Sequence, residues 1–177
     1  AVARLEAGDL DMYADDIAGE AAVQAINSDA IQTRTQYGLF DELLFNLGTC
    51  QDETLLNPFV NQNIREAMNY AIDRNYVAQE LYNGLAVPKY TTIAEASADR
   101  ARFAAEIRAL EAKYAYNLET ARELISAEME GMGATLENDV WTFNGEPITL
   151  IFLIRSEDTR LAIGGYIATQ LEDLGFT

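Results

Sequence analysis

The sequence contains no histidine among its 177 residues and only one cysteine, Cys50. Without histidine, neither a Ser-His-Asp or Cys-His catalytic site nor an imidazole metal site can form. Cys50 has no partner for an internal disulfide, and no neighbouring cation in the sequence favours a reactive thiolate. The sequence therefore predicts a free structural thiol and no histidine-based chemistry.

Other sequence signatures of chemistry are missing as well. Several acids within residues 9–16 suggest a calcium loop, but Tyr13 stands where a ligand is needed and Ala14 where glycine is needed. The chain has no P-loop and no GxGxxG motif. Paired carboxylates for glycoside chemistry stay open among 29 acidic residues, although no spacing singles out a pair. We expect a binding protein without catalytic residues, metal or cofactor.

Basic residues are also few, since 12 Lys and Arg face 29 acids and the net charge is −17. Such a chain repels phosphate backbones and anionic headgroups, which disfavours nucleic-acid binding and electrostatic membrane docking. The longest largely apolar run, residues 148–154, is far below the roughly 20 residues of a membrane span and suits a buried strand. An apolar content of 49% excludes disorder.

Residues 57–84 predict a helical corner, around which the rest of the chain is organised. Pro58 suits a first helical turn, and an apolar stripe with helical spacing follows it. Asp73 is expected to cap a second, shorter helix, and Asn83-Gly84 to stop it in the left-handed conformation. The stripe consists of Ile64, Ala67, Met68, Ala71 and Ile72.

The remaining pattern mixes strands and helices, which predicts an α/β fold. Strands are expected at 31–35 and 39–47, and Asn144-Gly145 predicts a tight turn in a β-hairpin over 140–154. Helices are expected at 15–27, at 94–113, from a cap at Asn117 to Gly131, and at 157–174 behind a cap at Ser156. In strand 39–47, we expect Leu43, Phe45 and Leu47 on one face and Leu44 and Asn46 on the other.

Three runs in fixed order resemble a known family: NPF at 57–59, IREAMNYAIDR at 64–74 and YNGLAVP at 82–88. These runs resemble the extracytoplasmic solute-binding proteins of peptide and nickel ABC importers, bacterial extracellular solute-binding protein family 5. Segments 4–12, 44–46, 114–125 and 155–175 match the family pattern too. Asn61 replaces the usual acid, and 94–113 is an insertion.

The resemblance implies part of a two-lobed periplasmic-binding-protein type II fold. Residues 1–46 would form the end of lobe one and the crossing strand, and residues 47–177 the first part of lobe two. The family's function is to capture oligopeptides or similar solutes and deliver them to an ABC permease outside the cytoplasm, in the periplasm or anchored to the outer face of the membrane. An acidic scaffold or interaction domain is the alternative.

The resemblance also places the crossing strand against the ligand cleft, so Tyr37, Glu42, Leu44 and Asn46 are candidate solute contacts. For Asn46, side-chain hydrogen bonding that fixes a bend is the competing interpretation. Arg65 and Arg74 are expected to pair with nearby acids such as Asp73 rather than with ligand.

The first residues read as a helix already under way, so we expect either that an export signal was removed or that this is an internal fragment, and we favour the fragment. The acid that grips a peptide's α-amino group in the family would then lie further along. We therefore expect no measurable peptide binding by these residues alone. We also expect either disorder near the N-terminus or a homodimer formed through exposed strand edges.

Overall fold

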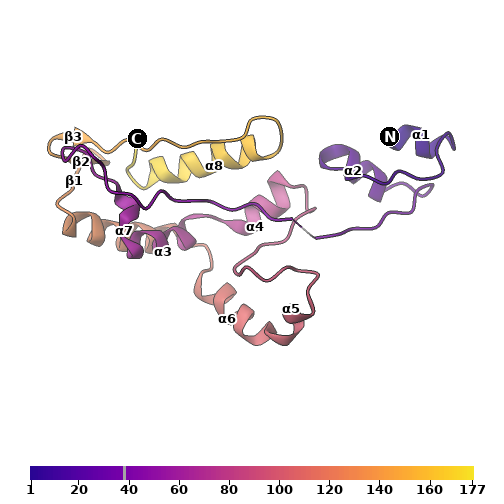
Figure 1. Ribbon diagram of the computed structural model, residues 1–177, viewed down its shortest axis with the longest axis horizontal. Helices are drawn as coiled ribbons and strands as arrows, with labels where there is room; N and C mark the ends of the chain where they lie inside the picture. The colour runs from indigo at the N-terminus through magenta and orange to yellow at the C-terminus, as the bar shows by residue number, and fades with distance from the viewer. Residues whose placement is uncertain (38) are drawn as a thin grey trace.

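The computed structural model describes residues 1–37 and 39–177, and it combines helices with a small antiparallel sheet (Figure 1). The mixed α/β class is therefore confirmed. The elements are α1 (Val2–Glu6), α2 (Gly19–Ile26), η1 (Pro58–Val60), α3 (Gln62–Ala71), α4 (Arg74–Tyr76), η2 (Val77–Leu81), α5 (Ala98–Arg102), α6 (Ala104–Lys113), α7 (Leu118–Gly131), β1 (Thr135–Glu137), β2 (Val140–Phe143), β3 (Glu146–Pro147) and α8 (Arg160–Asp173).

The helical corner is built by successive asparagine and aspartate caps. Asn57 caps the 3₁₀ turn η1, and the Asn61 side chain accepts a hydrogen bond from the backbone N–H of Asn63 at the start of α3. Asp73 caps α4 as predicted, since its Oδ1 accepts from the N–H groups of the next turn at 2.9 and 3.1 Å. Asn83 and Gly84 then adopt φ angles of 52° and 73°, which confirms the left-handed stop.

The sheet has the order β1-β2-β3, and Asn144-Gly145 forms the β2–β3 turn with φ angles of 54° and 84°. β1 was missed by the sequence reasoning. The predicted hairpin over 140–154 is wrong in length, because β3 ends at Pro147. Beyond it, Leu150 N–H donates to Thr177 C=O at 2.7 Å, and Thr177 N–H donates to Ile148 C=O at 3.2 Å. Residues 151–154 have no backbone hydrogen bond within the described chain.

Several other predicted elements differ from the structure. The helix expected at 94–113 is two helices, α5 and α6, because Phe103 leaves helical geometry with ψ 25°. The helix expected at 157–174 begins at Arg160 after Thr159, so Ser156 is not its cap. The helix expected at 15–27 begins only at Gly19. Residues 31–35 and 39–47 are not assigned as strands.

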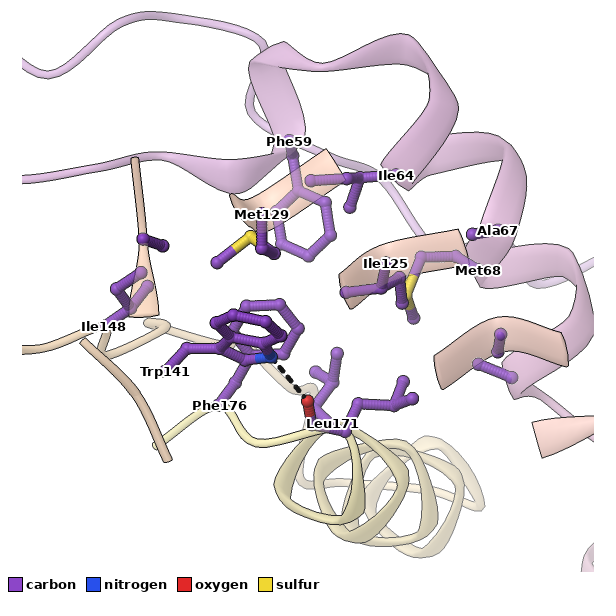
Figure 2. Packing of buried hydrophobic residues seen from close by; sticks show 14 of the residues in the cluster. Phe59, Ile64, Ala67, Met68, Ile125, Met129, Trp141, Ile148, Leu171 and Phe176 are labelled. Carbon is purple, nitrogen blue, oxygen red and sulfur yellow. Dashed lines mark hydrogen bonds between the residues drawn. The ribbon is translucent and has the colours of Figure 1, made fainter. Parts of the chain in front are cut away.

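The core lies where α3, α7, β2 and the C-terminal turn meet (Figure 2). The buried α3 stripe packs against α7, whose buried residues Ala121, Ile125 and Met129 recur every four positions. Trp141 is only 1% exposed, and its indole Nε1–H donates to the Leu174 carbonyl at 2.9 Å, the dashed bond in Figure 2. This bond joins β2 to the turn after α8.

Helices α1 and α2 lie at one end of the molecule, apart from this core (Figure 1). They contact each other and bury Val2, Ala22 and Ala25 between them. Helices α5 and α6 project from another side of the molecule (Figure 1). The route from α2 to the core therefore runs through residues 27–57, and this route contains the predicted site residues.

Candidate functional site

We call residues 39–48 the crossing segment, because they carry the chain from the N-terminal helices onto the core. Its side chains alternate as predicted over the middle of the segment. Leu43 and Phe45 are half-buried and pack on the core, and the Phe45 ring centroid lies 4.5 Å from that of Phe59. Leu47, expected on the same face, is 59% exposed instead, so that part of the prediction is wrong. The chain has already turned toward the loop at this point.

Three of the four predicted contact residues share the outward face of the crossing segment. Glu42, Leu44 and Asn46 are all exposed, and Leu44 is 78% exposed. The fourth residue, Tyr37, is exposed and lies before the crossing segment. Among the described residues, no hydrogen bond joins Tyr37 to the other three. The surface therefore offers a carboxylate, a large apolar side chain and an amide at alternating positions.

The C-terminal end of the crossing segment is fixed by asparagine side chains. Asn57 Nδ2 donates to the backbone carbonyls of Asn46 and Gly48, at 2.9 and 2.8 Å. Asn46 Oδ1 accepts from the Gly48 N–H at 3.0 Å. This geometry supports the competing interpretation of Asn46, in which its amide fixes a bend. The same side chain is exposed, so contact with a solute is compatible with this role.

The N-terminal end of the crossing segment is held by three different parts of the chain. The Tyr82 hydroxyl donates to the Asp41 carboxylate, and Arg160 Nη1 lies 3.9 Å from Asp41 Oδ1. Lys89 Nζ lies 4.7 Å above the centre of the Phe40 ring. Burial, followed by the hydrogen bond to Asp41, raises the pKa of Tyr82, so its hydroxyl keeps its proton and remains a donor.

Arg160 also connects this end to the start of α8. Its guanidinium contacts the Asp158 carboxylate through Nε and Nη2, and these hydrogen bonds hold the pKa of Asp158 well below its usual range. Arg155 Nε lies 3.6 Å from the same carboxylate. Asp158 therefore remains charged and keeps Arg160 in place next to Asp41. Sequence reasoning missed these contacts, since Asp41, Tyr82 and Arg160 are far apart in the chain.

The expected ion pairing of Arg65 and Arg74 is wrong. Arg65 Nη1 donates to the backbone carbonyls of Phe59 and Val60, at 2.7 and 3.0 Å. Arg74 donates to the backbone carbonyl and the side-chain oxygen of Asn69, at 3.0 and 2.8 Å, and stacks on Tyr90. Burial lowers the pKa of Arg74 from its ordinary value. Both arginines therefore stabilise the corner.

An open groove of about 350 Å³ lies between α3 and α7. Its two carboxylates are already engaged. Glu128 accepts hydrogen bonds from Asn61 and Asn63 at 2.7 Å each, and Glu66 accepts from Lys113 at 2.8 Å and from Tyr114 at 2.9 Å. These bonds lower the pKa of both glutamates. The groove is therefore explained by contacts that join α3 to α7 and α6.

A smaller apolar hollow of about 100 Å³ lies beside the C-terminus, lined in part by Leu150, Phe152 and Phe176. In the same stretch the alternate residues Ile151 and Leu153 point outward, with exposed fractions of 90% and 89%. Residues 148–154 thus alternate like the crossing segment, with one side on the core and one side exposed.

Two general findings apply to the described part of the chain, residues 1–37 and 39–177. No three or more aspartate, glutamate or cysteine side chains come together there in an arrangement that could hold a metal ion. In the same residues, no helix has both the length and the apolar character needed to cross a bilayer.

Comparison with protein families gives one match, and it covers the whole chain. Residues 1–177 match the model described as "Bacterial extracellular solute-binding proteins, family 5 Middle". A comparison with curated proteins gives no significant match. The chain therefore belongs to family 5 of the bacterial extracellular solute-binding proteins. This confirms the resemblance, and it establishes a solute-binding role in import and an extracytoplasmic location.

Proposed function

We propose that this chain is part of a receptor that captures an oligopeptide or a similar solute and delivers it to an ABC permease. In this proposal the receptor has no catalytic role, and its chemistry is limited to binding and release. It acts on the outer side of the cytoplasmic membrane, either in the periplasm or anchored to that face. Family membership supports the general role, and the peptide class and the permease are the parts that we add.

The observation that carries the proposal is the exposed face of the crossing segment between two fixed ends. Glu42 and Leu44 point outward there, while Leu43 and Phe45 hold the backbone on the core. A surface fixed in this way can meet a solute at little cost in ordering, because its backbone is already constrained.

The chemistry of that face suits part of a peptide. The Glu42 carboxylate can accept charge-assisted hydrogen bonds from an ammonium or guanidinium group. Leu44 offers apolar contact area to an adjacent side chain, and each buried CH₂ contributes roughly 0.8 kcal/mol. Tyr37 adds an aromatic ring nearby in the sequence. We assign these three residues to solute contact, and Asn46 to shaping the segment with a contact through its amide.

Calorimetric titration of the complete protein, including any sequence that flanks these 177 residues, tests the proposal. A pool of short peptides is titrated into the parent protein, into Glu42→Ala and into Leu44→Ala. We expect Glu42→Ala to weaken binding of peptides with a cationic group by about tenfold, the effect of roughly 1.4 kcal/mol. Leu44→Ala should weaken all peptides, with or without a cationic group, by about fourfold for each CH₂ that the peptide buries, the effect of roughly 0.8 kcal/mol.

Glu137→Ala is the matched control, because Glu137 is also exposed but lies on β1. This variant should bind like the parent protein. Unchanged affinity of Glu42→Ala for every ligand that the parent binds would remove Glu42 from the site. Saturable binding of a different solute class, with no peptide bound, would refute the peptide proposal.

A further inference from the structure

The contacts of Asp41 connect the crossing segment to η2 and α8. Asp41 is exposed, and the Tyr82 hydroxyl and the Arg160 guanidinium approach its carboxylate from η2's C-terminal turn and from the first residue of α8. These two elements also contact each other. The Asp41 carboxylate therefore holds the crossing segment at the point where η2 and α8 meet.

The chain just before Asp41 is held differently. Within the described residues 27–37, the backbone hydrogen bonds are those of the turn after α2, and the last of them joins Ile31 N–H to Ser28 C=O. Within the part of the chain that the structure describes, no backbone or side-chain hydrogen bond involves residues 32–37, and these residues are all exposed. Among the described residues that follow, from 39 onward, the first side-chain contacts with the rest of the chain are those of Phe40 and Asp41.

We propose that Asp41, Tyr82 and Arg160 form a latch that holds the crossing segment on the core. The latch makes the segment move with η2 and α8 rather than with α1 and α2. When α1 and α2 move, the crossing segment from Asp41 onward then stays in place on the core. The segment keeps its register, with Leu43 and Phe45 on the core and Glu42 and Leu44 outward. In this way Tyr82 and Arg160 act as positioning residues for the solute contacts, a consequence that rests on the proposed function.

The chemistry of the latch explains why these residue types are suited to it. A tyrosine hydroxyl bound to a carboxylate is a charge-assisted hydrogen bond, which is stronger than one between neutral groups. Arg160 is itself anchored by Asp158, so it approaches Asp41 from a fixed direction. Phenylalanine at position 82 would keep the ring and remove only the hydroxyl. Tyr82→Phe therefore removes the charge-assisted hydrogen bond of the latch and leaves the contact between Arg160 and Asp41 in place.

Thiol labelling of a residue on the core-facing side of the crossing segment measures how often the segment leaves the core. In the complete protein, with Cys50 and any other native cysteine replaced by serine, Leu43→Cys places a thiol on the half-buried face. A water-soluble maleimide then reacts at a rate set by opening of the segment. We expect Tyr82→Phe to accelerate labelling about tenfold, which corresponds to roughly 1.4 kcal/mol.

Three controls make the outcome specific. Tyr76→Phe also removes a hydroxyl from an exposed tyrosine near the corner. Within the described residues the Tyr76 hydroxyl makes no hydrogen bond, whereas its backbone N–H does, so this variant should leave the rate unchanged. A thiol at the adjacent outward position, Leu44→Cys, should react rapidly whether or not Tyr82 carries its hydroxyl. Asp41→Ala should accelerate labelling of the Leu43→Cys thiol at least as much as Tyr82→Phe does, because it removes the contacts with both Tyr82 and Arg160.

Combining Asp41→Ala with Tyr82→Phe should add little to Asp41→Ala alone, because Asp41→Ala already removes the bond to Tyr82. Equal labelling rates in the parent protein, Tyr82→Phe and Asp41→Ala would overturn the latch, and so would fully additive effects. If Tyr82→Phe fails to fold, Asp41→Ala at the exposed carboxylate decides the question. Peptide titration tests the site separately from the latch. If Tyr82→Phe labels faster, but Tyr82→Phe and Glu42→Ala both bind peptides with the affinity of the parent protein, the site assignment is refuted and the latch is supported.

Discussion

Replacing Trp141 by phenylalanine should destabilise the fold more than its conservative character suggests. The indole is 1% exposed, and its Nε1–H donates to the Leu174 carbonyl at 2.9 Å. Phenylalanine cannot donate this bond, and no other donor to the Leu174 carbonyl is found within the described residues. A buried acceptor left without a partner costs about 1–3 kcal/mol.

The smaller ring adds a packing loss to this cost. Trp141 lies in the cluster with Ile148, Leu174 and Phe176, where a cavity cannot fill without moving the C-terminal turn. Complete removal of a buried aromatic costs about 3–5 kcal/mol, so the partial loss from indole to benzene should be about 1 kcal/mol. The total expected decrease in the free energy of unfolding is about 2–4 kcal/mol.

Urea unfolding followed by far-UV circular dichroism measures this decrease, since Trp141 is the only tryptophan and its fluorescence is lost in the variant. With a slope of about 2 kcal/mol per molar urea, the midpoint should fall by about 1–2 M. Tyr13→Phe, an exposed aromatic outside the core, should keep the parent midpoint. A Trp141→Phe midpoint indistinguishable from that of Tyr13→Phe would refute the assignment of the indole bond as a structural link.

Three further changes test separate parts of the fold. Gly175 has φ +94°, and a Cβ there would lie 2.9 Å from Trp141 Cδ1, so Gly175→Ala should lower the free energy of unfolding by about 1–3 kcal/mol in the same urea assay. Asp73→Ala removes the cap of α4 and should lower it by about 1 kcal/mol, again read from the urea midpoint. The pKa of Glu128 lies below its ordinary value of 4.5 because two asparagine amides bind the carboxylate. Its contribution to stability is therefore present above pH 4.5 and lost as the pH falls through the lowered value, so the difference in urea midpoint between the parent and Glu128→Gln should be largest near neutral pH and vanish in strong acid.

Local signals allowed the helical corner to be predicted because each rests on neighbouring residues. The cap at Asp73 needs only N–H groups two and three positions on, and the stop at Asn83-Gly84 needs only positive φ angles. The cap at Asn117 is of the same kind, with Oδ1 accepting from the Thr120 N–H at 3.1 Å. The cap expected at Ser156 failed because the chain enters α8 three residues later, through an acidic turn that contacts Arg160.

Strands were harder to predict because a strand is defined by its neighbour rather than by its own residues. Residues 148–154 show the alternation expected of a strand, and residues 39–47 show it only at Leu43 and Phe45, which pack on the core. Only the start of 148–154 finds backbone partners, at Trp141 and Thr177. The period-two pattern therefore predicted the buried positions of Leu43 and Phe45 correctly, but it failed at Leu47 and could not predict hydrogen bonds. The buried strand expected at 148–154 is wrong in part, because Ile151 and Leu153 are exposed.

The candidate site shows the same division between local and distant information. Alternation correctly predicted that Glu42, Leu44 and Asn46 share one exposed face. It gave no sign that Asn57 would hold one end or that Tyr82 would hold the other. Such contacts join residues that are far apart in the sequence, as Asp41 and Arg160 are, and no spacing rule predicts them.

The two arginines show why residue type alone misled the assignment of charges. In a chain with net charge −17, the excess of acids predicts a carboxylate partner for every base, yet Arg65 and Arg74 both donate to backbone oxygens. Carbonyl groups at the ends of short helices lack intrahelical donors, and a guanidinium presents several N–H groups that can satisfy them. Such acceptors exist at every residue and therefore leave no mark in the sequence.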